Sequence, residues 1–179
     1  TDAATRRPTS REAFMRRVKL DRIDRQILRD LQENGRTTNV ELAKRAGISA
    51  PPCLRRVRAL EEAKVIRGYH ADVDAEELGF GVTVFALVGL QSQAETDLRA
   101  FEQLTIGWDE VRETHMLAGE TDFLLKIVAI DWDSYQRFLT TKLTAAPNVA
   151  HVRSSLAIRA AKQLPGVPIA VETPQEASA

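Results

Sequence analysis

Three arginines, Arg55, Arg56 and Arg58, lie almost side by side in the sequence. A guanidinium group presents several N–H donors in a planar fork, which matches the acceptor edge of guanine or the oxygens of a phosphate. Ser49 and Pro51 precede these arginines, and a hydroxyl group beside the start of a helix favours an anion. The segment therefore indicates recognition of a polyanion such as DNA, although three arginines on a short helix are also compatible with a simple solvated face.

A helix is expected immediately before this segment. Thr38-x-x-Glu41 is a capping-box pattern, in which each side chain bonds to the backbone of the other residue. Within the helix that follows, we expect Val40, Ala43 and Ala46 to face inward. Because these side chains are mostly small, the next helix can pack closely against them.

That next helix begins after a tight turn. Gly47 permits the positive φ that the turn needs, and Ser49 is the expected N-cap. Prolines fit the first helical turn, where N–H groups have no intrahelical partner. Helical periodicity turns one set of residues inward: Cys53, Leu54, Val57 and Leu60. It turns a second set outward: Pro51, Pro52, Arg55, Arg58 and Ala59. The inward position of Cys53 favours packing over chemistry.

Two further elements complete a domain over residues 20–73. A first helix is expected to start at Asp21 and to end at Gly35, with the inward residues Ile23, Ile27, Leu28 and Leu31. Two short strands, residues 65–66 and 69–73, are expected to form a wing or a β-extension. The whole contains a helix-turn-helix, which lays its second helix in the major groove of DNA, and a wing would make it a winged helix-turn-helix.

Each polar residue of this domain has an expected partner on DNA. Arg55 is expected to read a base edge, while Arg58 and Arg67 bind phosphates. The hydroxyl groups of Thr38 and Ser49 are also expected to contact phosphates. The predicted DNA-binding set is Thr38, Ser49, Pro51, Arg55, Arg56, Arg58 and Arg67, with no particular role assigned to Arg56.

The charge of the chain is divided unequally. Residues 1–70 contain 17 Lys and Arg against 9 Asp and Glu, whereas residues 71–179 contain 8 against 16. A basic part attracts polyanions and an acidic part repels them, which predicts two domains with different roles. The basic leader, residues 1–19, is interpreted as a disordered segment, as an arm that contacts phosphates, or as both.

The composition also bears on the compartment. The single cysteine, Cys53, cannot form an intramolecular disulfide, which suits a reducing cytoplasm. The sequence has no apolar run typical of a signal peptide or of a membrane span. We therefore expect a soluble cytoplasmic protein with no membrane partner.

Residues 82–163 follow a different pattern, after a polar linker at residues 74–81. Strands and helices are expected in the order βαββαβ. The strands are expected at residues 82–90, 110–117, 122–130 and 149–158. The helices are expected at about residues 95–104, after the Ser92-x-x-Glu95 capping box, and at residues 132–144. This order predicts an α+β, ferredoxin-like domain with two helices on one face of an antiparallel sheet. Residues 164–179 are expected to form a flexible tail.

The strand at residues 82–90 is apolar on both faces. One face carries Val82, Val84, Ala86, Val88 and Leu90, and the other carries Phe85 and Leu87. Because the two helices can cover only one face of the sheet, the other face predicts association with a second copy, most simply in a symmetric dimer.

A turn between the two central strands is a candidate ligand site. Gly119 is expected to need a positive φ or a close backbone approach. Asp122 at the start of the next strand is suited to pair with an ammonium group, the alternative being a carboxylate that caps the turn.

Several motifs resemble the Lrp/AsnC, or feast/famine, family of transcriptional regulators over about residues 20–163. They are Leu20-Asp-Arg-Ile-Asp-Arg-x-Ile-Leu28, Asn39-Val-Glu-Leu42, Pro52-Cys-Leu-x-Arg-Val-Arg-x-Leu-Glu61, Ile66-x-Gly-Tyr69, His115 two residues after a glutamate, and Gly119-x-x-Asp122. The resemblance implies a regulator of amino-acid metabolism genes that binds double-stranded DNA. It also implies dimers that assemble further, often into octamers, with an amino-acid effector bound where neighbouring dimers meet. The implied effector-binding residues are Met116, Leu117, Ala118, Gly119, Glu120, Thr121, Asp122, Ser155, Leu156 and Ala157.

The sequence departs from the leucine-responsive type in two places. Glu120-Thr121 replaces an acidic-aromatic pair, and residues 154–159 replace a Tyr-Val-Val-like run. These departures predict a smaller, more polar pocket, for alanine or another amino acid. The long basic leader resembles an actinobacterial subgroup that includes the regulator of alanine dehydrogenase.

Two other functions remain open from the sequence. One is a nucleoid-organising protein that wraps DNA without a ligand. The other is a small hydrolase fused to a DNA-binding module, which the residues favour less because His70, His115 and His151 lie far apart. We expect no enzymatic activity, no metal and no cofactor.

Overall fold

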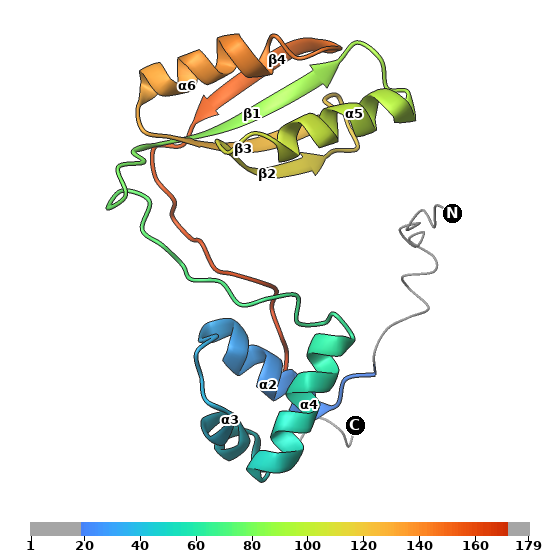
Figure 1. Ribbon diagram of the computed structural model, residues 1–179, viewed down its shortest axis with the longest axis vertical. Helices are drawn as coiled ribbons and strands as arrows, with labels where there is room; N and C mark the ends of the chain where they lie inside the picture. Colours follow the sequence, from blue (N-terminus) through green and yellow to red (C-terminus); the bar gives the residue numbers. More distant parts are fainter. Residues whose placement is uncertain (1–18, 172–179) are drawn as a thin grey trace. The chain divides into compact units, whose positions relative to one another are not determined.

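The computed structural model describes residues 19–171, so the predicted leader lies outside the described residues except for Lys19. The described chain forms two compact units (Figure 1). The first unit contains residues 19–71 and 164–171, and the second contains residues 72–163.

The first unit contains three helices, α2 (Arg22–Glu33), α3 (Asn39–Ala46) and α4 (Ala50–Glu62). Their buried core consists of Ile27, Leu42, Ala43, Ala46, Cys53 and Leu60. The two alanines of α3 bring its backbone close to α4, as a helix-turn-helix requires. Cys53 is fully buried in this core, as its inward position predicted.

Local sequence signals determine where these helices begin. Asp21 caps α2 by accepting the N–H of Asp24 at 2.9 Å, and Asp24 caps the Asp21 N–H in return. Thr38 and Glu41 form the predicted capping box of α3. Gly47 has the predicted positive φ, 69°, at the end of α3. α2 ends at Glu33 with Asn34 as its C-cap, whose N–H bonds to the Asp30 carbonyl, so the predicted stop Gly35 directly follows the cap, although its φ is not positive.

Two helix faces differ from the prediction. Val40 is 68% exposed, and Leu42 takes the inward position instead. Steps of three residues drift by about 60° around a helix, so Val40 rotates away from the face that Leu42, Ala43 and Ala46 share. Leu54 is 38% exposed, since it lies about 100° from the buried Cys53.

The two predicted wing strands are not formed in the described chain. The N–H groups of Val65 and Ile66 both bond to the Leu60 carbonyl and close the end of α4, so they are not available to a strand ladder. Residues 69–73 have no strand partner among the described residues. Tyr69 instead lies over Gly35 and donates its O–H to Glu61 at 2.8 Å. Burial and this hydrogen bond raise the pKa of Tyr69 to about 12.

The second unit has the predicted βαββαβ order. It consists of β1 (Val82–Leu90), α5 (Glu95–Ile106), β2 (Val111–Met116), β3 (Phe123–Ala129), α6 (Trp132–Phe138) with a π-helical continuation, η1 (Leu139–Leu143), and β4 (Val149–Leu156). The four strands form one antiparallel sheet in the order β2-β3-β1-β4, as Figure 1 shows. This is the expected α+β, ferredoxin-like arrangement.

One face of the sheet is covered by both helices. Val84, Ala86 and Val88 of β1 are fully buried there. Phe101 of α5 packs 4.9 Å from Phe123 of β3, measured between ring centroids. The predicted capping box at Ser92 and Glu95 is wrong, because α5 begins after Ala94 and the Ser92 hydroxyl donates to Asp97.

The other face of the sheet is uncovered within one chain. Strand register places Phe85 opposite Lys126 and Ser155, and Leu87 opposite Leu124 and Arg153, on this face. Phe85 is 39% exposed, although it lies on a central strand. The two-sided apolar pattern predicted for β1 is therefore present in the structure.

Part of the predicted tail, residues 164–171, contacts the first unit. Val167 forms two hydrogen bonds with the Gln32 side chain of α2, so this segment is docked on the first unit. Residues 172–179 of the predicted tail lie outside the described residues.

The aromatic core supports the first test. Phe101 is 1% exposed, whereas Ile106 on the same helix is 76% exposed. We expect Phe101→Ala to lower the free energy of unfolding by about 3–5 kcal/mol, because it removes a buried ring and leaves a cavity. Ile106→Ala, the matched control, is expected to change it by less than about 0.5 kcal/mol. Urea unfolding followed by tryptophan fluorescence reports on this unit, since Trp108 and Trp132 both belong to it. Equal effects of the two substitutions would contradict this packing.

Candidate DNA-binding surface and effector site

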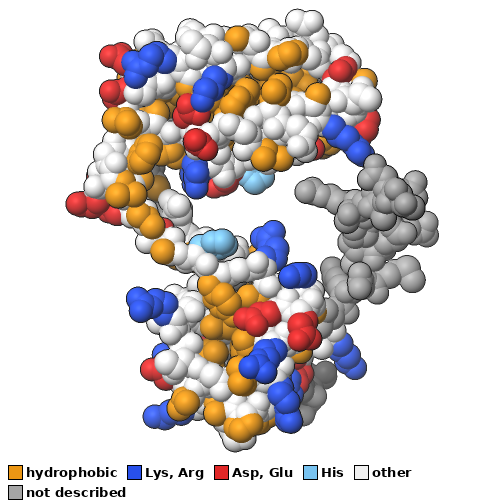
Figure 2. Space-filling model, in the orientation of Figure 1, with side chains coloured by type: hydrophobic (Ala, Val, Ile, Leu, Met, Phe, Trp, Pro, Cys, Tyr) orange, Lys and Arg blue, Asp and Glu red, His pale blue; other side chains and the backbone are white. Residues whose placement is uncertain are grey.

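The exposed face of α4 carries most of the predicted DNA contacts. Arg55, Arg58 and Pro51 are all exposed there. Ser49 is the N-cap of α4, yet its side chain makes no capping hydrogen bond, which leaves its hydroxyl for another acceptor or donor. Figure 2 shows Lys and Arg side chains spread over the visible face of the first unit, with carboxylates between them. The helix that the sequence assigned to the major groove thus presents a polar, cationic face.

Arg56 forms ion pairs with two carboxylates of the same chain. Its guanidinium lies 2.7 Å from the Asp21 carboxylate and 2.8 Å from that of Asp24. The pKa of Asp21 is lowered, first by the Asp24 N–H and then by Arg56. Hydrogen bonds to Asp24 and Asp21 in turn raise the pKa of Arg56. Because these bonds tie α4 to the start of α2, Arg56 has a structural role, and its contact with DNA stays a prediction.

Thr38 is also occupied. Its hydroxyl donates to the Glu41 carboxylate at 2.8 Å and accepts the Glu41 N–H at 3.3 Å. The Thr38 backbone N–H is the largest cause of the lowered pKa of Glu41, so this carboxylate is negative at neutral pH. A negative group here disfavours a phosphate, and the phosphate contact of Thr38 stays a prediction.

A residue without an assigned role joins the two helices of the motif. Asn39 donates its side-chain N–H to the Ala50 carbonyl at 2.8 Å, which links the starts of α3 and α4. Its Oδ1 is buried and has no partner among the described residues. Arg67 is exposed, as expected, but it lies in the loop after α4 and not on a wing.

The turn between β2 and β3 is held by backbone bonds. The Leu117 N–H donates to the Asp122 carbonyl at 2.8 Å, and the Asp122 N–H donates to the Val88 carbonyl at 3.1 Å. The Asp122 Oδ2 accepts the N–H of Leu90 at 2.6 Å. Asp122 therefore caps the end of β1 with one oxygen, and its Oδ1 accepts no hydrogen bond from the described residues.

Gly119 does not have the predicted backbone constraint. Its φ is not positive, and a Cβ added there would meet no atom within 4 Å in the described chain. The space beside this turn is open, so the fold of one chain gives no steric reason for glycine at this position.

The second predicted set of effector residues lies at the other end of β1. Ser155 pairs with Phe85, and the Ala157 N–H donates to the Thr83 carbonyl at 2.9 Å. Asp122, by contrast, binds Val88 and Leu90. Five residues of strand, roughly 17 Å, separate Thr83 from Val88. The structure therefore does not bring the two sets together within one chain.

Two protein-family models match the chain. A model of winged helix-turn-helix DNA-binding domains matches residues 20–67, and the Lrp/AsnC ligand binding domain matches residues 83–167. The leucine-responsive regulatory protein of Rhizobium meliloti (strain 1021) is 56% identical over 146 residues, which cover 82% of this chain and 94% of that protein. The chain belongs to the Lrp/AsnC family.

Further Lrp/AsnC similarities extend over most of the chain. The Bkd operon transcriptional regulator of Pseudomonas aeruginosa is 40% identical over 142 residues, covering 79% of this chain and 93% of that protein. A crystal structure of a Neisseria meningitidis transcriptional regulator in complex with L-methionine superposes with a TM-score of 0.78 at 37% identity, covering 83% and 96% of the two chains. The predicted class, a DNA-binding transcriptional regulator with a ligand-binding domain, is confirmed.

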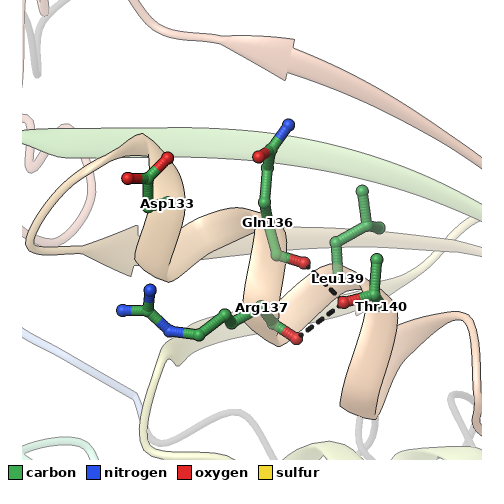
Figure 3. A pocket seen from close by; sticks show the side chains of 5 residues that line it. All are labelled: Asp133, Gln136, Arg137, Leu139 and Thr140. Carbon is green, nitrogen blue, oxygen red and sulfur yellow. Dashed lines mark hydrogen bonds between the residues drawn. The ribbon is translucent and has the colours of Figure 1, made fainter.

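A surface hollow on α6 lies apart from the predicted effector residues. Its volume is about 460 Å³, and it is lined by Asp133, Gln136, Arg137, Leu139 and Thr140 (Figure 3). The Thr140 hydroxyl donates to the carbonyls of Gln136 and Arg137, as the dashed lines show. The β2–β3 turn is the stronger candidate, because the hollow is an open groove in which the Thr140 hydroxyl is already bonded within the helix.

No helix in residues 19–171 is long and apolar enough to cross a membrane.

The ion pairs of Arg56 generate the second test. We expect Arg56→Met to lower the free energy of unfolding of the first unit by about 1 kcal/mol at neutral pH, because it leaves two carboxylates without their cation. The pKa of Asp21 is lowered in the folded state, so its contribution is present above the unfolded value of 3.8 and is lost as pH falls through the folded pKa. The difference between variant and parent should therefore shrink in acid.

Thermal unfolding followed by far-ultraviolet circular dichroism at several pH values measures this difference. Arg55→Met is the matched control on the same helix, and we expect no comparable loss from it. A pH-independent deficit, or an equal deficit in the control, would contradict the structural role of Arg56.

Proposed function

We propose that an amino acid is the effector of this Lrp/AsnC regulator and that it binds between two copies of the chain. One copy contributes the turn at residues 116–122, and the other contributes residues 155–157. The observation that carries the proposal is the placement of these sets at opposite ends of β1, through Asp122 at Val88 and Leu90 and through Ala157 at Thr83. A single chain cannot close a pocket for one amino acid from both sets.

Asp122 supplies the charge for such a site. Its Oδ2 is fixed by the Leu90 N–H, which orients the carboxylate and leaves Oδ1 to accept from an ammonium group. The open space at Gly119 admits the ligand beside the backbone. The Neisseria regulator was crystallised with L-methionine, which supports an amino acid as the ligand class. Glu120 and Thr121 favour a smaller, more polar ligand such as alanine.

The DNA contacts of the proposal come from α4 and the loop after it. Arg55 reads a base edge in the major groove, and Pro51 lies at the same face. Ser49, Arg58 and Arg67 contact phosphates, since the hydroxyl of Ser49 makes no capping bond and both arginines are exposed.

The uncovered sheet face is the proposed dimer interface. Phe85 and Leu87 of β1, with Leu124 of β3, form its apolar centre. Lys126 and Glu113, whose charged groups lie 3.0 Å apart, provide a polar edge. A two-fold axis places the same face on both partners, and the dimers then assemble into an octamer through the effector turns.

DNA binding gives the third test. We expect Arg55→Ala to weaken operator binding by about 1–3 kcal/mol and to relax discrimination at one base pair, because it removes a side chain from the base edge. Arg67→Ala is the comparison, since a lost phosphate contact weakens all sequences alike and flattens the salt dependence. Fluorescence anisotropy with operator and random duplexes at several salt concentrations separates the two effects. Unchanged discrimination in Arg55→Ala would contradict the facing of α4, and equal affinity for all duplexes in the parent would favour ligand-independent DNA wrapping.

The effector site gives the fourth test. A thermal-shift screen of the twenty amino acids should identify a ligand that adds about 2.7 kcal/mol of stability at 100 times its dissociation constant. We expect Asp122→Asn to lose this shift, because the amide can still accept the Leu90 N–H but carries no charge for the ammonium. Asp109→Asn, at an exposed carboxylate elsewhere in the unit, should retain it. A full shift in Asp122→Asn would make Asp122 a turn residue only, and no shift in the parent would remove the effector from the proposal.

A further inference from the structure

The side chain of Gln32 forms a two-point contact with the C-terminal segment. Its Nε2 donates to the Val167 carbonyl at 2.7 Å, and its Oε1 accepts the Val167 N–H at 3.0 Å. The side-chain amide of Gln32 thus pairs with both the backbone N–H and the carbonyl of Val167, as a neighbouring strand would. The segment at residues 164–171 therefore belongs to the first unit, although it follows the second unit in the chain.

The residues on either side of Val167 restrict the backbone conformation at this contact. Pro165 and Gly166 have the residue types of the two central positions of a type II turn, and Gly166 has the positive φ, 74°, that the second position requires. A Cβ on Gly166 would overlap the Gln32 side chain. Pro168 restricts the preceding residue to extended conformations, so Val167 presents its N–H and its carbonyl in a fixed direction. The Pro-Gly-Val-Pro run thus forms a rigid docking element.

This element connects the two units a second time. One connection lies between α4 and β1, where the chain passes from Ala71 of the first unit to Asp72 of the second. The other begins at Ala157, whose N–H donates to Thr83 in the second unit, and ends at Val167 on α2. Residues 158–166 between these anchors are exposed. A domain that is tethered at two points has less rotational freedom than one tethered at a single point.

We propose that residues 164–171 form a latch, which docks on Gln32 of the same chain and transmits effector binding to the DNA-binding unit. The inference rests on the proposed function, because the chain that leads to the latch leaves β4 at residues 155–157, where the effector site is proposed. Ligand contacts at that end of β4 shift the anchor at Ala157, and the latch conveys the shift to α2. Two hydrogen bonds at the protein surface hold the latch, so it opens at small cost.

Cross-linking tests the latch without any ligand. Gln32→Cys combined with Gly166→Cys places the two thiols where the Gln32 side chain meets Gly166. We expect mild oxidation to produce a disulfide within one chain, seen as a faster-migrating monomer on a non-reducing gel. Cys53 is fully buried and does not compete. Gln32→Cys with Leu164→Cys is the matched control, and it should cross-link at least about tenfold more slowly. A disulfide between chains, or equal rates in both pairs, would overturn the latch.

DNA binding tests the transmission. We expect the amino acid with the largest shift in the thermal-shift screen to change the operator dissociation constant of the parent by about fivefold or more, and by less than twofold in Gln32→Ala. Val167→Pro removes the N–H without altering α2 and should behave in the same way. Glu33→Ala, at the exposed neighbour of Gln32, should retain the parent ratio. A full effector response in both latch variants would overturn the transmission. If the parent shows no effector response, the proposed function fails and transmission fails with it, while the cross-link still decides whether the latch exists.

Discussion

The effector domain depends on β1, which pairs with β3 along one edge and with β4 along the other. Its alternating side chains place Val84, Ala86 and Val88 in the helix-covered core and leave Phe85 and Leu87 on the open face. A register slip of one residue would exchange these two faces, so burial on the helix side fixes the register. The same strand holds Asp122 near its end and Ala157 near its start.

In the proposed two-copy site, this placement would couple assembly to ligand binding. Residues fixed at opposite ends of one strand cannot surround a small ligand unless another chain supplies the missing half. An oligomer would then create the site, and a ligand bound there would stabilise the oligomer in return.

In the DNA-binding unit, the packing of α4 determines which side chains are exposed. The small alanines of α3 and the Arg56 ion pairs hold α4 in place, so that Arg55 and Arg58 point to solvent.

The sequence predicted features that are encoded locally. The caps at Asp21 and Thr38, the turn at Gly47 and the βαββαβ order all follow from short patterns, and the structure has each of them. Other local patterns predicted the wrong detail, and contacts between distant residues were missed. The inward face of a short helix is broad, so Val40 and Leu54 were misplaced, and the expected wing residues Val65 and Ile66 close α4 instead. The contact of Gln32 with Val167 spans 135 residues, and no local pattern reveals it.

The two-copy effector site is tested most directly by mixing two inactive variants. Asp122→Asn removes the charge at the turn, and Ala157→Glu adds bulk and a negative charge at the end of β4. Each variant alone should bind no effector by calorimetry. After co-refolding in equal amounts, random assembly gives about one quarter of the sites an intact turn from one variant and an intact strand end from the other. Binding is expected to return at about this level, with the affinity of the parent. Mixed oligomers that remain unable to bind would contradict a site shared between chains.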